Sequence, residues 1–172
     1  MNPLELLIGT WRGKGTGEYP SIAPFSYIEE IKFQDNGFRD VIQYEQRTWL
    51  DEARTSPSHW ETGLIRLLGE HEIEIINAQI GRRVEVLVGD IELKGPQHFV
   101  IDLNSITIAN DVRMVGTQRH IEISGNQLFY TMSMAMTKVP TTTHHLQATL
   151  VRGLECGSLE TPSSDLFETY DS

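Results

Sequence analysis

The sequence predicts an all-β fold, namely a single antiparallel up-and-down β-barrel of about ten strands preceded by a short N-terminal helical turn. Apolar and polar residues alternate with a period of two in the stretches EIEII, VEVLV and HIEIS. This alternation is typical of strands that bury one face. Turn-forming residues separate the stretches at short intervals, as they do in barrels. Helical periodicity is hard to find after Ile8.

The first twenty residues predict the helical turn and a bent first strand. Residues 2–8 form the turn, with Asn2 as its cap and Pro3 at the first helical position. Residues 9–20 read GTWRGKGTGEYP, in which glycines surround Trp11 and Tyr19. Such glycines indicate a strand whose backbone approaches packed aromatic rings and bends at a barrel corner. No Gly-Lys-Ser/Thr follows, so the stretch is not a phosphate-binding loop.

The remaining strands follow one another with short connections. Asn36-Gly37 predicts the turn of a hairpin. The predicted strands are residues 25–33, 38–49, 58–67, 72–79, 84–88, 91–94, 99–104, 105–109, 119–123, 127–136 and 145–151. Residues 153–172 turn to Gly, Ser, Thr, Pro and acidic residues. We therefore expect a barrel domain over residues 1–152 and a flexible acidic tail over residues 153–172.

Bulk properties restrict the function. The 172 residues carry a formal net charge of -10 and no basic stripe, which disfavours nucleic acid and anionic membranes as partners. No apolar run approaches membrane length, and the first residues lack the pattern of a signal peptide, so we expect a cytoplasmic protein. The single cysteine, Cys156, excludes an internal disulfide and a cysteine-based zinc cluster. The oligomeric state stays open.

Histidines are the strongest candidates for a functional site. His144 and His145 lie together in TTTHHLQATLVR, at the start of the last predicted strand. Imidazole binds zinc, copper and haem iron, but neighbouring residues of a strand point to opposite faces. His59, in SHWETGLIR, is a third candidate. Surface positions are expected for His71, His98 and His120, and solvated positions for the paired carboxylates Glu29-Glu30.

Several motifs together resemble the nitrobindin family of haem-binding β-barrels, which are similar in shape to lipocalins and fatty-acid-binding proteins. GTWRGKGTGEYP resembles the family's GxWxGxGxGxYP opening, and HWETGLIR resembles its H-x-E-x-G-x-x-R strand. IEIINAQIGRRVEVLVG resembles the segment containing Ala-Gln-x-x-G and Val-Glu-Val-x-x-G. LFYTMSMAM and HHLQATLVR resemble the closing strand pair. The matches follow one another in order from Gly9 to Arg152.

The resemblance implies one haem b per chain, with His145 as the proximal ligand of its iron. It also implies that the haem binds nitric oxide and, in its ferric form, isomerises peroxynitrite to nitrate. His59 matches a residue near the distal side of the haem. Gln79 and Met134 match other positions that line the pocket. The family carries a basic residue near Ala109 that could serve a haem propionate; this chain has Asn110 there. Arg113 or Arg119, which we expect to be exposed strand or turn residues, are the candidates to replace it.

Two points stay open in the sequence. The segment 137–143 is one residue longer than the family pattern, and strict alternation places Leu146, Ala148 and Leu150 on the face of His144. A β-bulge at the start of the strand would instead turn His145 toward that face.

The function has alternatives too. The barrel could be a non-catalytic carrier of a fatty acid or another apolar ligand, which calls for a basic residue deep inside, and Arg66 is the main candidate. It could also be a haem sensor or store without turnover.

Overall fold

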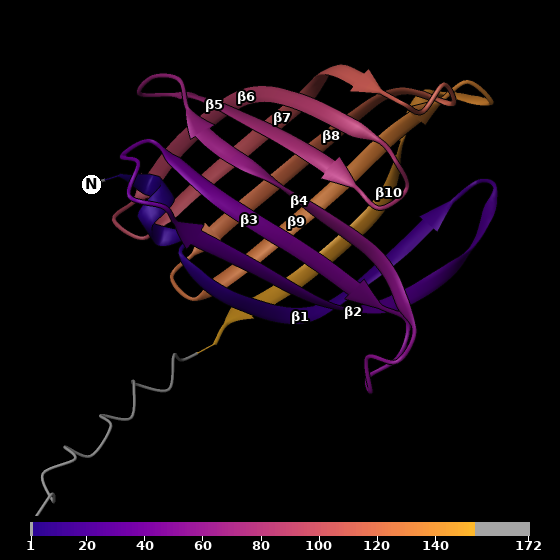
Figure 1. The fold of residues 1–172 in the computed structure, drawn as a ribbon, viewed down its shortest axis with the longest axis horizontal. Coiled ribbons are helices and arrows are strands. Elements are labelled where there is room, and N and C mark those ends of the chain that lie inside the picture. The colour runs from indigo at the N-terminus through magenta and orange to yellow at the C-terminus, as the bar shows by residue number, and fades with distance from the viewer. Residues whose placement is uncertain (1, 154–172) are drawn as a thin grey trace, which may run out of the picture.

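Residues 2–153 form a closed barrel of ten antiparallel strands in the computed structural model (Figure 1), and this confirms the predicted fold class. Every strand pairs with its neighbours in sequence, and β1 closes the barrel by pairing with β10. The elements are the 3-10 helix η1 (Pro3–Leu6) and the strands β1 (Gly9–Tyr19), β2 (Ile22–Asp35), β3 (Val41–Trp49), β4 (Pro57–Leu67), β5 (Glu72–Gln79), β6 (Val84–Gly95), β7 (His98–Ala109), β8 (Met114–Ser124), β9 (Gln127–Met136) and β10 (Val139–Arg152). Apart from Gly153, the predicted tail lies outside the described residues, as does Cys156.

Two long strands, β6 and β7, replace four short predicted ones between residues 84 and 109. The prediction of a break near Gly89-Asp90 was wrong because Gly89 lies within β6, opposite Leu103. A Cβ atom at Gly89 would stand 1.7 Å from the carbonyl oxygen of Asp102 on β7. The glycine therefore marks a close approach of two backbones inside the sheet, and not a turn.

The N-terminal turn closes one end of the barrel. The side chain of Asn2 accepts a hydrogen bond from the backbone N–H of Leu4, as the predicted cap requires. Leu4 and Leu7 are buried, and the indole nitrogen of Trp11 donates to the carbonyl oxygen of Leu7 at 2.7 Å. The guanidinium of Arg152 lies 4.6 Å from the Trp11 ring centre. Since this end is closed, access to the interior is through the opposite end, which we call the mouth.

The glycines of β1 make room for large side chains on β2. Gly15 pairs with Tyr27 and Gly17 with Phe25 across the two strands. An added Cβ would lie 2.2 Å from the Tyr27 ring at Gly15 and 2.3 Å from the Phe25 ring at Gly17. The glycine-rich opening thus lets two aromatic rings lie over the inner surface of β1, as expected from the sequence.

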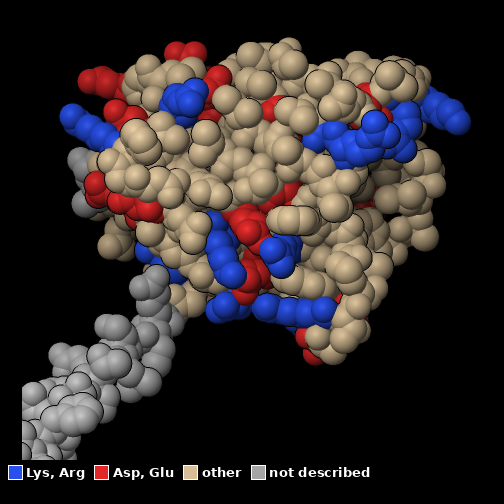
Figure 2. Space-filling model, viewed as in Figure 1, with Lys and Arg blue, Asp and Glu red and all other residues tan. Residues whose placement is uncertain are grey.

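Charged side chains of both signs lie in separate groups among uncharged residues on the face seen in Figure 2. Several charged side chains form ion pairs. Glu30 was expected to be solvated but is only 8% exposed, and its carboxylate lies 2.7 Å from Arg12 and 3.3 Å from both Lys32 and Arg54. Within residues 2–153, no helix has the length and apolar character needed to cross a membrane.

Candidate functional site

A cavity of about 260 Å³ runs inside the barrel from Leu7 at the closed end to His145 at the mouth. Its closed half is apolar, with Ile31, Phe33 and Ile75 among the lining residues. Polar and charged side chains form a belt nearer the mouth. The belt residues that line the cavity include Tyr27, Tyr44, Gln46, His59, Glu61, Arg83, Arg119 and Tyr130.

His145 lines the cavity at the mouth, on β10. Its ring lies edge-on to Tyr19, with the ring centres 5.6 Å apart, and 6.5 Å from the centre of Phe25. Its Nδ1 atom is 3.0 Å from the carbonyl oxygen of Glu18, which can only accept, so Nδ1 carries the proton. Burial lowers the pKa of His145. The ring is therefore neutral, and the lone pair of Nε2 is available to a metal.

A β-bulge places His145, and not His144, on the cavity. His144 pairs with Ser133 and Leu146 pairs with Met132, so His145 is an extra residue between two successive pairs. The bulge interrupts the alternation, and both His145 and Leu146 line the cavity. His144 lies instead over a separate hollow with Glu18 and Gln147, whose side chains are on the outer surface.

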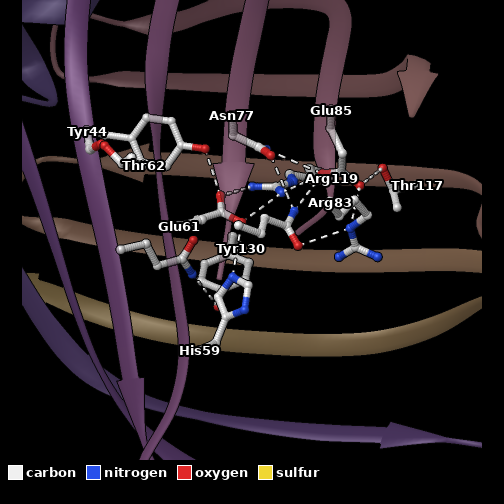
Figure 3. Close-up of polar contacts among 12 residues, drawn as sticks. Tyr44, His59, Glu61, Thr62, Asn77, Arg83, Glu85, Thr117, Arg119 and Tyr130 are labelled. Atoms are coloured by element: carbon white, nitrogen blue, oxygen red, sulfur yellow. Dashed lines mark hydrogen bonds and ion pairs between the residues drawn. The ribbon is translucent and has the colours of Figure 1, made fainter. Parts of the chain in front are cut away.

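His59 also lines the cavity, near the start of β4, and contacts a buried carboxylate (Figure 3). Its Nε2 atom is 3.2 Å from Oε2 of Glu61, a side chain that is 3% exposed. Glu61 further accepts hydrogen bonds from the Tyr44 hydroxyl at 2.7 Å and from Arg119 at 2.7 and 3.2 Å. Burial alone would raise the pKa of Glu61, but the charge of Arg119 and the hydrogen bonds outweigh it and hold the pKa well below its ordinary value.

Arg119 is the centre of this network. Its Nη2 atom also lies 3.0 Å from Oε2 of the buried Glu85, and this ion pair joins Arg119 to β6. The expectation that Arg119 is an exposed strand or turn residue was wrong. Arg119, Ile121 and Ile123 occupy alternate positions of β8 and share its inner face, so the period-two pattern of HIEIS already indicated its direction.

Glu29 belongs to a second buried polar group. It is fully buried and accepts hydrogen bonds from Gln46 and from the Tyr130 hydroxyl, the latter at 2.9 Å. Tyr130 in turn lies 2.9 Å from the hydroxyl of Tyr27. Burial raises the pKa of Glu29 to about 8 despite these bonds, and no ion pair within residues 2–153 offsets it. The expectation of a solvated Glu29 was wrong, since it shares the inner face of β2 with Tyr27 and Ile31.

The other predicted site residues lie around the mouth with different contacts. Gln79 joins the network by donating to Glu85 at 3.1 Å and accepting from Arg83 at 3.0 Å, but it does not line the cavity. Met134 is buried against Tyr19 in a small cluster at the mouth. The neighbouring position on the same face, Met132, lines the cavity.

Two arginines proposed from the sequence as ligand-binding residues do not line the cavity, and a third arginine does. Arg113 is exposed and forms a two-pronged ion pair with Asp111 at 2.8 and 2.9 Å, away from the cavity. Arg66 pairs with Glu74 and does not line the cavity either. Arg83, which sequence reasoning missed, does line it. The signal was its position two residues before the inward-facing Glu85.

Comparisons with known proteins agree with the motifs. A family model described as a THAP4-like, haem-binding β-barrel domain matches residues 1–152. The chain is 37% identical over 142 residues to peroxynitrite isomerase Rv2717c of Arabidopsis thaliana, and the matched region covers 83% of this chain and 82% of the relative. It is 32% identical over 157 residues to peroxynitrite isomerase 2 of Mycobacterium marinum, covering 88% and 94%. The crystal structure of Rv2717c from M. tuberculosis superposes with a TM-score of 0.81 at 28% identity, covering 88% of this chain and 95% of the other.

Proposed function

The chain belongs to the THAP4-like family of haem-binding β-barrel domains, and we propose that it isomerises peroxynitrite to nitrate at a ferric haem b held by His145. Membership confirms the resemblance to the nitrobindin family, and with it haem as the cofactor. The observation that carries the proposal is the state of His145, a neutral imidazole at the cavity mouth with its Nε2 lone pair free. Nitric oxide is the second ligand that we assign to the same haem.

The residues present fit a haem. A hydrogen bond from the distant ring nitrogen to a backbone carbonyl is how proteins fix a metal-binding histidine, and Glu18 provides that carbonyl. Within residues 2–153, no group of three or more His, Cys, Asp or Glu side chains is arranged to hold a metal ion. One imidazole therefore suits a metal that brings most of its own ligands. Phe25, Met132 and Leu146 give the macrocycle an apolar surface beside His145.

Arg83 is the cation that we assign to a haem carboxylate, in place of Arg113. Within residues 2–153 its contacts, to Gln79 and Glu85, use the Nε atom, so its terminal nitrogens remain for a further anion. Only 15% of its side chain is exposed, which strengthens an ion pair there relative to one on the open surface. Arg113 already has both prongs on Asp111.

When bound, haem supplies a ferric iron that promotes O–O cleavage of peroxynitrite, whose two fragments recombine to nitrate. The chain contributes the surroundings. Apolar walls exclude water and keep the fragments together, which favours recombination over escape. The Glu18 carbonyl keeps the proton of His145 on Nδ1. No protein nucleophile is needed.

The pairing of Arg119 disfavours a fatty-acid carrier that binds its carboxylate at this residue. Such a carrier needs Arg119 to be free to meet the carboxylate of the fatty acid. Arg119 is inside, but both of its terminal nitrogens contact Glu61 or Glu85. A fatty acid would have to displace a buried carboxylate that is better placed than its own.

Reconstitution with hemin tests the function. Wild-type protein should give the Soret band of a histidine-ligated ferric haem, and His145→Ala should lose it. His144→Ala is the matched control and should keep the band, since His144 lies outside the cavity. Stopped-flow decay of peroxynitrite, compared with free hemin and with the haem-free protein, then separates an isomerase from a sensor or store. A retained band in His145→Ala would refute the assignment of the ligand.

The partners proposed are small molecules, namely peroxynitrite and nitric oxide, without nucleic acid or a membrane. The net charge of -10 supports this because it repels both kinds of polyanion. We also propose a cytoplasmic location, which fractionation of cells expressing the tagged chain would test.

A further inference from the structure

The contact between His59 and Glu61 is not needed to hold the haem at His145. Both side chains line the cavity, and Figure 3 shows the His59 ring pointing to the carboxylate. His59 is 32% exposed and Glu61 is 3% exposed. His59 is therefore the accessible member of the pair, and Glu61 is its buried, anionic member.

The state of Glu61 fixes where the proton of His59 lies. Arg119 holds Glu61 ionised, so its carboxylate can only accept hydrogen bonds. The Nε2 atom of His59, 3.2 Å from Oε2, must then carry the proton in the neutral ring. Its Nδ1 atom has no hydrogen-bond partner within residues 2–153 and keeps a lone pair.

Glu61 is itself held rigidly. The Tyr44 hydroxyl and an Arg119 nitrogen bind Oε1, each at 2.7 Å. The second Arg119 nitrogen, at 3.2 Å, and His59 share Oε2. Contacts from two other strands, β3 and β8, therefore set the direction in which Glu61 presents its carboxylate to His59.

We propose that His59 accepts the proton of a small, weakly acidic ligand entering the cavity, and that Glu61 is the positioning residue that orients His59 for this task. The ligand class is a neutral acid H–X, which for the proposed function is peroxynitrous acid. The inference rests on the proposed function, because a haem ligand is what would take up the anion.

The step is a proton transfer and needs no further reactant. The H–X bond breaks, its electron pair stays on X, and the proton binds Nδ1 of His59. His59 becomes an imidazolium whose charge is balanced by Glu61, and X⁻ remains in the cavity. The arrangement follows the logic of the carboxylate–histidine pairs of hydrolases, in which the carboxylate selects the tautomer and stabilises the charged ring. The proton returns to water when the product leaves.

The tautomer can be measured without haem. Long-range proton–nitrogen correlation spectra of the haem-free full chain, labelled with ¹⁵N in histidine, distinguish a protonated Nε2 from a protonated Nδ1. His59→Gln identifies the signals. A proton on Nε2 of His59 is expected, and a proton on Nδ1 would overturn the proposal.

The proton transfer is tested by comparing two ligands of the haem-loaded chain. Hydrogen cyanide must lose a proton to bind ferric haem as cyanide, whereas nitric oxide has no proton. Glu61→Gln and His59→Gln should each slow cyanide association at pH 7 by at least about tenfold, because general acid–base groups typically contribute 10²–10⁴-fold. Association of nitric oxide with the ferrous form should stay unchanged. His98→Gln, which changes a histidine paired with a carboxylate on the outer surface (Nε2 of His98 lies 2.8 Å from Glu122) and away from the cavity, is the control and should keep the wild-type cyanide rate.

The outcomes separate the two proposals. Unchanged cyanide rates in Glu61→Gln and His59→Gln, or equal slowing of nitric oxide, would overturn the proton-acceptor role, since equal slowing means altered access. Absence of a Soret band in the wild-type protein would overturn the haem function instead, and the tautomer measurement would still decide the role of Glu61.

Discussion

Glu29 makes the stability of the barrel depend on pH in an unusual direction. It is fully buried, has hydrogen bonds but no ion pair among the described residues, and burial raises its pKa from 4.5 to about 8. Between these two pH values the unfolded chain is ionised at this position while the folded chain keeps its proton. Unfolding then releases a proton, so the free energy of unfolding must fall as pH rises.

The magnitude follows from the two pKa values. One pH unit corresponds to about 1.4 kcal/mol for one proton, so this group alone lowers the stability by roughly 5 kcal/mol between pH 4.5 and pH 8. Glu29→Gln removes the titration and keeps the size of the side chain. The amide can still accept from Gln46, while Tyr130 must reorient its hydroxyl, at a cost of about 1 kcal/mol that does not vary with pH.

Urea unfolding of both proteins at pH 5, 6, 7 and 8 measures the effect. We expect Glu29→Gln to gain stability relative to wild type steadily with pH, and to be the more stable protein at pH 8. All other titrating groups are common to both chains and cancel in the difference. A difference that is the same at every pH, with unchanged m-values, would show that Glu29 is not protonated in the folded state and would refute the reasoning.

Three further predictions follow from the cavity and its rim. Gly15→Ala should destabilise the fold by about 1–3 kcal/mol in urea unfolding, because its Cβ would lie 2.2 Å from the Tyr27 ring, whereas Gly69→Ala, with open space around it, should change little. Arg83→Ala should lose hemin to apomyoglobin faster than wild type, and Arg113→Ala should lose it at the wild-type rate; the reverse order would contradict the assignment to Arg83. Association of azide anion with the ferric protein should accelerate as salt is added, while that of neutral hydrogen cyanide should not, because salt screens the net charge of -10. Equal salt dependence would exclude this electrostatic reason.

The sequence predicted the elements wherever local chemistry determines them. The bounds of β5 and β9 match the prediction, and Asn2 caps η1 as expected, because alternation and capping act within a few residues. Glu29 and Arg119 were misplaced for a different reason. Charged residues are rarely buried, which predicts exposed positions for both, whereas the alternation of their strands points both side chains inward.

The position of His145 could not be read from β10 alone. Strict alternation along HHLQATL places His144 on the face of Leu146, and only the pairing with β9 shows where the extra residue lies. A bulge depends on how two strands are aligned, and that alignment is fixed by the whole barrel. The sequence could therefore reduce the choice to two neighbouring histidines, and the register between β9 and β10 decides which of them faces the cavity.

The charges inside the barrel are balanced although the whole chain is strongly acidic. Glu61 and Glu85 face Arg119 and Arg83, and the elevated pKa of Glu29 keeps this carboxyl neutral at pH 7. The interior thus adds no net charge to repel an anion once it has formed there, whereas the outer field of -10 opposes an anion that approaches from water. A neutral acid crosses that field without cost. A proton acceptor beside the mouth, such as His59, therefore lets the ligand enter as a neutral acid. The anion then forms inside the cavity, where the negative field of the outer surface no longer opposes its entry.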